Sequence, residues 1–225
     1  MTVLITAGPT REFIDPVRYL SNPATGRLGY LIARRALQKG HRVILVSGPT
    51  FLRIPQGLTY IPVTTARQMQ RCVLQYLPQA DALVMTAAVS DWRPACTRRS
   101  KIKKKKAWYL PLVPNPDILK SVKKRKRPGQ LVVGFALETD APKKHGLRKL
   151  KEKGMDLIVV DSPEFFGKEN PKSPVLAISA TGETVGWQGI SKEKLASFVV
   201  SFLEQKQPGR KDLLSFLAKA QVKGR

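Results

Sequence analysis

Two segments of this chain carry side chains that could do chemistry on a phosphorylated substrate. Lys101 and Lys103 fall in a segment that we expect to be extended, so their side chains share one face. Cations placed in this way suit a triphosphate and its leaving pyrophosphate; the alternative is a sheet edge protected by lysines. Asn22 and Gly26 lie in a long polar loop before a helical pattern, and the amino end of a helix favours an anion. The alternative for Asn22 is a turn or cap residue.

Two further clusters lie after a predicted strand and on a predicted helix. Asp91 follows residues 87–90, where it could accept a hydrogen bond from a base, a ribose or a water; a helix cap is the alternative. Lys149 and Lys153 are spaced i,i+4, which suggests a shared anion, although exposed helices often tolerate such pairs. The sequence shows no pattern of a catalytic triad, a phosphate loop or a metal site. Together the clusters predict an anion-binding α/β enzyme.

The apolar pattern predicts how these residues are positioned. Short apolar runs alternate with helical patterns, which predicts a Rossmann-like α/β fold with a mostly parallel sheet and helices on both faces. Ligands of such sheets bind beyond the carboxyl ends of the strands, where the clusters above are expected. The clearest runs span residues 3–6, 43–46, 82–85, 131–135 and 157–160.

Two regions interrupt this alternation. Residues 101–113 predict two short extended pieces that form a lysine-rich flap or hairpin, and Pro111 keeps the second piece from being a central strand. Residues 175–187 predict a second hairpin late in the chain. A proline-glycine break then separates one predicted domain, 1–206, from a basic C-terminal tail, 207–225.

The charge balance is extreme, with 40 Lys and Arg against 16 Asp and Glu and a formal net charge of +24. Nucleic-acid binding, polyanionic small substrates and a generally basic surface all remain open. Aromatic residues make up 7% of the chain and, apart from Trp108 and Tyr109, are not interleaved with the basic runs. A stacking platform for bases is therefore not expected. An inactive basic α/β scaffold that binds nucleic acid is kept as the alternative function, and nucleic acid is not an expected partner.

A Rossmann oxidoreductase is a further alternative that the sequence disfavours. The opening lacks Gly-x-Gly-x-x-Gly, and the second strand ends at Val46-Ser47 without the acidic residue that would bind a ribose.

Other features predict a cytoplasmic protein that binds no membrane. No apolar run approaches the roughly 18–20 residues of a membrane span. A strand is expected directly after Met1, which leaves no room for a signal peptide. Cys72 and Cys96 are the only cysteines and predict neither a disulfide framework nor a metal site.

A series of short motifs runs through almost the whole chain. They are Thr-Ala-Gly-Pro-Thr-Arg-Glu at 6–12, Ile-Asp-Pro-Val-Arg at 14–18, Ser-Asn at 21–22, Ala-Ala-Val-Ser-Asp-Trp-Arg-Pro at 87–94, Lys-Ile-Lys-Lys at 101–104, Asn-Pro-Asp-Ile-Leu at 115–119, Gly-Phe-Ala-Leu-Glu-Thr at 134–139 and Asp-Leu-Ile-Val at 156–159. In this order and spacing, over about residues 2–204, they resemble the phosphopantothenoylcysteine synthetase family, the phosphopantothenate–cysteine ligases of coenzyme A biosynthesis.

The resemblance implies a two-step ligation. The carboxylate of 4′-phosphopantothenate attacks the α-phosphate of a nucleoside triphosphate, CTP or ATP, and the amine of L-cysteine then displaces the nucleotide from the acyl-nucleotide. Neither step needs a side-chain nucleophile, only positioning and charge neutralisation. Mg²⁺ would bridge the phosphates, with few protein carboxylates required. The resemblance also implies a homodimer with the flap near the interface, and a separate decarboxylase that acts downstream.

The resemblance assigns roles to particular residues. Lys101 would stabilise the first step, and Asn22 would donate its amide to the oxyanion of the acyl intermediate. The nucleotide site would be lined by Met85, Thr86, Ala87, Asp91, Lys101, Pro116, Asp117, Ile118, Leu119, Phe135, Lys149 and Lys153. The loop that holds the substrate and its anion would include Gly8, Arg18, Asn22, Thr25 and Gly26. No metal ligand is expected from protein side chains.

Two positions depart from the family pattern. The family often has Ser-Ser-Gly-Lys-Met-Gly in the opening loop, whereas residues 24–29 here are Ala-Thr-Gly-Arg-Leu-Gly, which keep one hydroxyl and the turn glycine. An Ala-Asn-Asp triplet commonly follows the late strand, and Val160-Asp161-Ser162 stands there in this chain. A contact carried over to this triplet is therefore not expected to be preserved.

Overall fold

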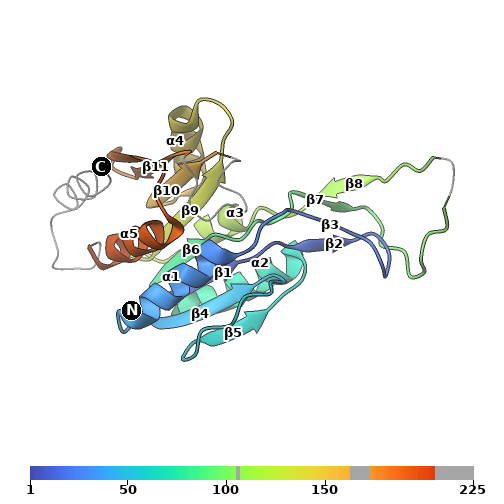
Figure 1. Ribbon diagram of the computed structural model, residues 1–225, viewed down its shortest axis with the longest axis horizontal. Coiled ribbons are helices and arrows are strands. Elements are labelled where there is room, and N and C mark those ends of the chain that lie inside the picture. Colours follow the sequence, from blue (N-terminus) through green and yellow to red (C-terminus); the bar gives the residue numbers. More distant parts are fainter. Residues whose placement is uncertain (105–106, 163–172, 206–225) are drawn as a thin grey trace.

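The computed structural model describes residues 1–104, 107–162 and 173–205. Within these residues the chain forms an 8-stranded sheet in the order β12-β11-β10-β9-β6-β1-β4-β5, which runs through the body of the molecule (Figure 1). Its strands are β1 (Thr2–Ala7), β4 (Arg42–Ser47), β5 (Thr59–Pro62), β6 (Ala82–Met85), β9 (Leu131–Leu137), β10 (Leu157–Asp161), β11 (Pro174–Ser179) and β12 (Thr184–Gln188).

The sheet is mostly parallel, as the sequence predicted. From β5 to β10 each neighbouring pair is parallel, whereas β11 and β12 form an antiparallel hairpin at the β10 edge, which confirms the late hairpin. All residues of β6 and β10 are buried. Near-continuous apolar runs are typical of parallel strands, because both faces of such a sheet are covered.

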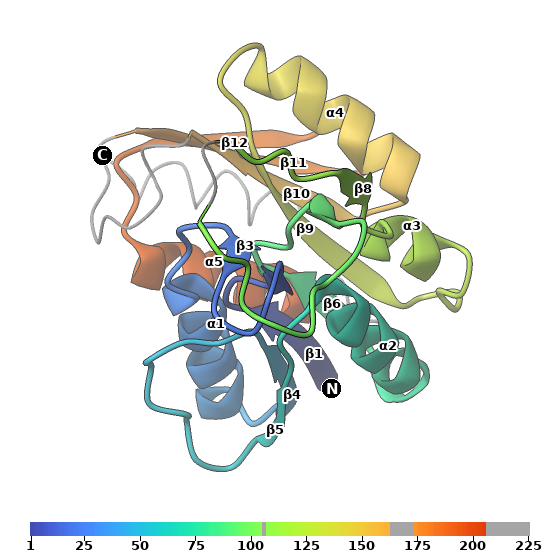
Figure 2. The same ribbon diagram turned by 90° about the vertical axis from the view of Figure 1, so that its right-hand side faces the viewer.

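Helices cover both faces of the sheet (Figure 2). On β1, Val3 and Ile5 belong to the core that includes α1 and α5, whereas Leu4 belongs to the core that includes α2, α3 and α4. This alternation follows from the pleat of a strand, which points successive side chains to opposite faces. The helices are α1 (Arg27–Gln38), α2 (Ala66–Tyr76), α3 (Ile118–Lys123), α4 (Pro142–Lys153) and α5 (Lys192–Gln205), with a 3-10 turn at Leu77–Gln79.

A long arm leaves the carboxyl end of the sheet and projects away from the body (Figure 1). It contains two antiparallel pairs, β2 (Arg11–Phe13) with β3 (Tyr19–Ser21), and β7 (Trp92–Pro94) with β8 (Leu112–Pro114). The predicted hairpin is therefore present, but its strands differ from the prediction. Residues 101–104 form no strand and lie in the connection between β7 and β8.

Some predictions concern residues outside the described part of the chain. These are the basic tail 207–225 and residues 105–106 of the predicted lysine-rich flap. None of the helices in the described segments is long and apolar enough to cross a membrane.

Candidate functional site

The amino end of α1 is held open by two glycines in left-handed conformations. Gly8 (φ 72°) follows β1, and Gly26 (φ 80°) is the N-cap of α1 and makes no side-chain cap. A Cβ atom at Gly8 would lie 2.9 Å from the carbonyl oxygen of Gly48, and one at Gly26 would lie 2.8 Å from Thr50 Cγ2. Both positions therefore need glycine, because a side chain would be strained and crowded.

A cavity of about 350 Å³ opens at this helix end, beyond the carboxyl ends of the central strands. Its volume lies within the range of ligand sites, roughly 300–1,000 Å³. Several residues predicted from the sequence line it together: Thr25, Gly26, Thr86, Ala87, Asp91, Phe135 and Lys149. These residues come from four separate segments of the chain, so the fold gathers them at one place. We call this cavity the strand-end cavity.

Gly29 allows α1 to approach the strands closely, and the sequence reasoning did not single it out. A Cβ atom there would lie 2.5 Å from Thr86 Oγ1 and 2.6 Å from the Cβ atom of Ala7. The Thr86 hydroxyl in turn donates to the carbonyl oxygen of Thr6 at 2.6 Å. The helix end is therefore fixed directly against β1 and the residue that follows β6.

Asn22 connects the opening loop to the loop that follows β6. Its Nδ2 atom donates to the carbonyl oxygens of Ala88 at 3.2 Å and Val89 at 3.3 Å. Both hydrogen bonds of the amide nitrogen are therefore made with backbone oxygens. The role of Asn22 as an oxyanion donor stays a prediction, and it requires that the amide exchange one of these acceptors for the intermediate.

The two predicted nucleotide lysines each have a carboxylate partner. Lys149 Nζ lies 2.7 Å from Glu138 Oε1, and Lys153 Nζ lies 3.3 Å from Asp117 Oδ2. Asp117 also caps α3, because its Oδ1 atom accepts the backbone N–H of Lys120 at 3.1 Å. The lysines thus do not share one carboxylate within the chain, and a phosphate would have to compete with these ion pairs.

The remaining predicted nucleotide residues lie outside the strand-end cavity. Met85, Ile118 and Leu119 are buried in the core, so only their backbone atoms could reach a ligand. Pro116 lines a different cavity near the base of the arm. Their assignment to the nucleotide site stays a prediction.

Lys101 and Arg18 lie on the arm rather than in the cavity. Arg18 Nη2 donates to the carbonyl oxygen of Ile102, and the buried Asp15 accepts the backbone N–H of Ile102 at 3.1 Å. Burial acts to raise the pKa of Asp15, but the backbone N–H donors, with that of Ile102 foremost, outweigh it and hold the pKa below its usual value. The lysine-rich segment is thereby attached to the β2–β3 loop. Lys101 is not among the residues that line the strand-end cavity.

Asp161 is a cavity residue that the sequence reasoning did not assign to the site. It ends β10, is 8% exposed and lines the strand-end cavity beside Lys192, which is 5% exposed. Burial raises the pKa of Asp161 to about 7, and the backbone and the charge of Lys192 only partly offset this rise. One sequence feature could have pointed to this residue: an aspartate stands here where the family commonly has an asparagine.

Fold and cavity together define a Rossmann-like α/β protein with a cavity at the carboxyl ends of its strands. The chain belongs to the DNA/pantothenate metabolism flavoprotein C-terminal domain family, whose profile matches residues 1–206. This result confirms the resemblance to phosphopantothenoylcysteine synthetase.

Individual relatives support the same family. The coenzyme A biosynthesis bifunctional protein CoaBC of Bacillus subtilis is 45% identical over 167 residues, which are 73% of this chain and 41% of that protein. The CoaBC of Mycobacterium tuberculosis is 43% identical over 218 residues, covering 89% of this chain and 52% of that protein. The crystal structure of the C-terminal domain of a CoaBC has a TM-score of 0.78 and 35% identity, and the match covers 91% of this chain and 94% of that domain. The chain therefore spans about half the length of these curated relatives and nearly all of the solved domain.

Proposed function

We propose that this protein is a phosphopantothenate–cysteine ligase that works through an acyl-nucleotide. The observation that supports this most is the strand-end cavity, which places the open end of α1 beside Thr86, Ala87, Asp91 and Lys149. The relatives act in coenzyme A biosynthesis by name, and their C-terminal half is the part that this chain matches.

In the first step, a carboxylate oxygen of 4′-phosphopantothenate attacks the α-phosphorus of the triphosphate. A new P–O bond forms, the bond to the bridging oxygen breaks, and pyrophosphate leaves. The acyl-phosphate centre would sit at the amino end of α1, where Gly26 makes no side-chain cap and the backbone N–H groups would stabilise negative charge. Lys149 would bind a phosphate in exchange for Glu138.

In the second step, the amine of L-cysteine attacks the acyl carbon. A C–N bond forms, the C–O bond to the nucleotide breaks, and the nucleoside monophosphate leaves while the ammonium proton is released. Asn22 would donate an N–H to the oxyanion that develops at the acyl oxygen. The loops joined by Asn22 and Ala88 would keep the two reacting groups together.

The co-substrate would be CTP or ATP, carried with Mg²⁺. Mg²⁺ keeps several waters and is often held through one or two carboxylates plus phosphates. Among the described residues, no group of three or more His, Cys, Asp and Glu side chains could hold a metal. An ion that arrives with the triphosphate would neutralise the phosphate charge.

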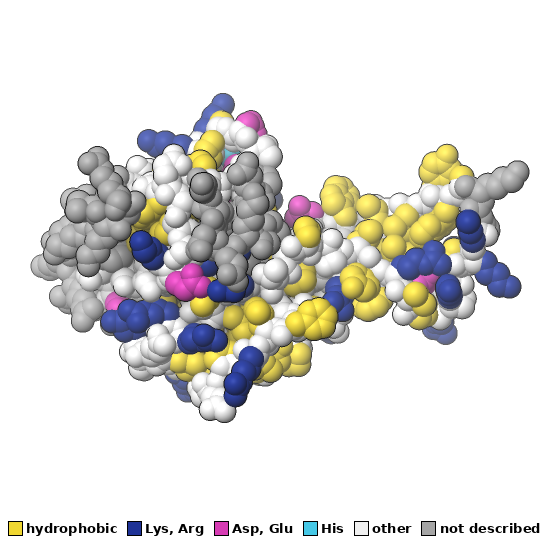
Figure 3. Space-filling view, viewed as in Figure 1, with side chains coloured by type: hydrophobic (Ala, Val, Ile, Leu, Met, Phe, Trp, Pro, Cys, Tyr) yellow, Lys and Arg dark blue, Asp and Glu magenta, His cyan; other side chains and the backbone are white. Residues whose placement is uncertain are grey.

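We also infer a homodimer in which the arm reaches a second copy. Lys101 lies between β7 and β8 of the arm and does not line its own strand-end cavity. The arm also displays a run of hydrophobic side chains (Figure 3). Val17 is 59% exposed, Trp92 is 52% exposed and Tyr109 is 88% exposed. Clustered apolar side chains of this kind mark interaction surfaces. Pairing of two arms would cover them and bring each Lys101 toward the cavity of the other copy.

A pyrophosphate-release assay tests the proposed function. Purified protein is incubated with 4′-phosphopantothenate, Mg²⁺ and either CTP or ATP, with and without L-cysteine. Pyrophosphate release should depend on phosphopantothenate, and formation of the amide should depend on cysteine. If the protein releases no pyrophosphate with CTP and none with ATP, the proposed ligase activity is disproved. If the same protein instead binds oligonucleotides with a steep salt dependence, the nucleic-acid alternative gains support. The proposal places the reaction in the cytoplasm, with a decarboxylase acting on its product.

A further inference from the structure

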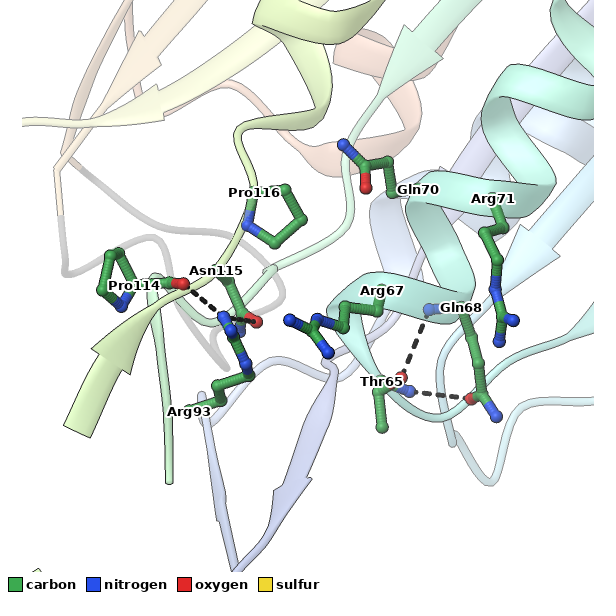
Figure 4. A pocket seen from close by; sticks show the side chains of 9 residues that line it. All are labelled: Thr65, Arg67, Gln68, Gln70, Arg71, Arg93, Pro114, Asn115 and Pro116. Atoms are coloured by element: carbon green, nitrogen blue, oxygen red, sulfur yellow. Dashed lines mark hydrogen bonds between the residues drawn. The ribbon is translucent and has the colours of Figure 1, made fainter. Parts of the chain in front are cut away.

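A second cavity lies between the amino end of α2 and the base of the arm, and of the residues assigned to the ligase reaction only Pro116 lines it. Its volume is about 710 Å³, and its lining includes Arg67, Gln70, Arg71, Arg93 and Asn115 (Figure 4). We call it the arginine pocket. None of its described lining residues also lines the strand-end cavity.

The guanidinium groups of Arg67 and Arg93 lie close together in the arginine pocket, whereas that of Arg71 points away from them (Figure 4). The Arg67 side chain reaches from the first turn of α2 toward Arg93 and Asn115 (Figure 4). Arg93 Nη1 donates to the carbonyl oxygen of Pro114 and to Asn115 Oδ1, the latter at 3.3 Å, so its position at the pocket is fixed. Arg71 lines the same pocket one helical turn beyond Arg67. No carboxylate lies among the described lining residues, so these like charges gather without a protein counter-ion.

This preference for an anion comes from side chains and not from an open helix end. The amino end of α2 is closed by a capping box. Thr65 Oγ1 accepts the backbone N–H of Gln68 at 3.2 Å, and Gln68 Oε1 accepts the backbone N–H of Thr65 at 3.0 Å. The backbone N–H of Ala66 also donates to Glu12 Oε1 at 2.8 Å, so the helix end is satisfied within the protein. The guanidinium of Arg67 and the remaining N–H groups of Arg93 are therefore the donors that face a ligand.

Two hydrogen bonds made by Asn115 lie between the arginine pocket and the strand-end cavity. The backbone N–H of Asn115 donates to the carbonyl oxygen of Asp91 at 2.7 Å, and Asn115 Nδ2 donates to the carbonyl oxygen of Ser90 at 2.9 Å. Asp91 lines one cavity, and Asn115 lines the other. A ligand in the arginine pocket would therefore occupy a site of its own.

We propose that the arginine pocket binds a phosphorylated small molecule of up to nucleotide size. The planar fork of a guanidinium matches two phosphate oxygens, which makes arginine well suited to bind phosphate groups. The pocket is far larger than a single phosphate requires and lies within the usual range for organic ligands. Pro114 and Pro116 add an apolar surface for the rest of the molecule. Binding at this site goes beyond the proposed ligase reaction and does not depend on it.

An NMR titration of the full-length, ¹⁵N-labelled protein tests this site. The probes are adenosine 5′-monophosphate, inorganic phosphate and, as the phosphate-free control, adenosine. We expect the two phosphate-bearing probes to shift the amide signals of Arg67, Gln70 and Arg71, and adenosine to leave them unchanged. Arg67→Gln should weaken this binding at least tenfold. Arg34→Gln removes the same charge from an exposed position on α1 and should leave the affinity unchanged.

The proposal fails if the phosphate probes leave these signals unmoved, or if Arg67→Gln and Arg34→Gln weaken binding equally. It also fails if a single-stranded oligonucleotide shifts the signals while adenosine 5′-monophosphate does not, because the basic face would then serve nucleic acid. Pyrophosphate release by the same Arg67→Gln protein reports on the strand-end cavity alone. A failed ligase proposal and a failed arginine pocket therefore give different results.

Discussion

The side-chain amide of Asn22 lies 3.2 Å from the carbonyl oxygen of Ala88, and this contact joins the loop before α1 to the loop after β6. These two loops flank the open helix end, so a group that links them is placed to act at the centre of the proposed reaction. In the proposed reaction, the link would allow a residue of the opening loop to act on a nucleotide bound at the neighbouring strand ends.

Replacing Asn22 by aspartate should separate the two chemical steps. A carboxylate is nearly the same size but cannot donate to the oxyanion or to Ala88. Loss of one oxyanion donor typically slows a reaction by about 10²–10³. We expect Asn22→Asp to release a first equivalent of pyrophosphate, to accumulate the acyl-nucleotide and to form the amide slowly, as measured by quenched flow. If pyrophosphate release and amide formation slow equally, Asn22 holds the loops together and has no separate role in the second step.

Lys101→Ala should abolish pyrophosphate release, and complementation should show which copy supplies the lysine. Mixing Lys101→Ala with Lys149→Ala protein lets two kinds of chain assemble. If the arm acts on the second copy, each mixed dimer contains one intact site, and random pairing restores about a quarter of the wild-type activity. If Lys101 acts within its own chain, no mixture regains activity. The two variants assayed alone give the baseline.

Sequence patterns predicted the sheet and part of the lining of the strand-end cavity, because both depend on local signals. Buried apolar runs such as 82–85 mark parallel strands. Because ligands bind at the carboxyl ends of such strands, Thr86 and Asp91 could be predicted to belong to one site. The ends of the arm strands gave a weaker signal. Trp92–Pro94 is a three-residue strand that contains a proline, and its pairing with residues near 113 depends on a long connection.

Two residues escaped prediction because only the fold makes them significant: Asp161, which lines the strand-end cavity, and Glu138, which pairs with the lining residue Lys149. Glu138 is an ordinary acid after a strand until the fold sets it 2.7 Å from Lys149. Asp161 has no local signal of burial beyond the apolar run before it. The sequence also placed Lys101 with the nucleotide residues, whereas the structure carries it along the arm. A single copy of the chain therefore brings together only some of the predicted site residues.

Asp161→Asn should make the free energy of unfolding depend less on pH between pH 5 and pH 8. The folded-state pKa of Asp161 is about 7, above the ordinary value of 3.8, because burial disfavours its charge. The folded state thus holds the proton more tightly than the unfolded state, so the free energy of unfolding decreases as the pH rises from about 4 through about 7. The amide has no proton to lose. Between pH 5 and pH 8 we expect the wild type to lose roughly 2 kcal/mol relative to Asp161→Asn.

Urea unfolding at several pH values measures this difference. Lys192 lines the cavity beside Asp161, and Lys149 and Asp91 line the same cavity, so all three charges stay in place in the variant. Asp140→Asn changes an exposed aspartate and serves as the matched control. Parallel pH curves for the wild type and Asp161→Asn would show that Asp161 titrates normally in the folded protein.

Gly26→Ala should destabilise the protein more than the matched change Gly40→Ala. Both glycines have left-handed backbone conformations, with φ 80° and φ 76°, so alanine meets similar strain of about 1–2 kcal/mol at each. The surroundings differ. A Cβ at Gly26 would lie 2.8 Å from Thr50 Cγ2 and 3.0 Å from the nitrogen of Gly8, whereas a Cβ at Gly40 has nothing within 4 Å.

The extra cost at Gly26 therefore measures how tightly the opening loop is packed against its neighbours. We expect Gly26→Ala to lower the melting temperature by several degrees more than Gly40→Ala. It should also raise the KM for phosphopantothenate, because the added methyl group displaces the N–H groups at the end of α1. Gly40 lies at the opposite end of this helix, so Gly40→Ala should keep the wild-type KM. Equal melting temperatures for the two variants would mean that Thr50 moves aside and that the loop tolerates a side chain at its anion-binding turn.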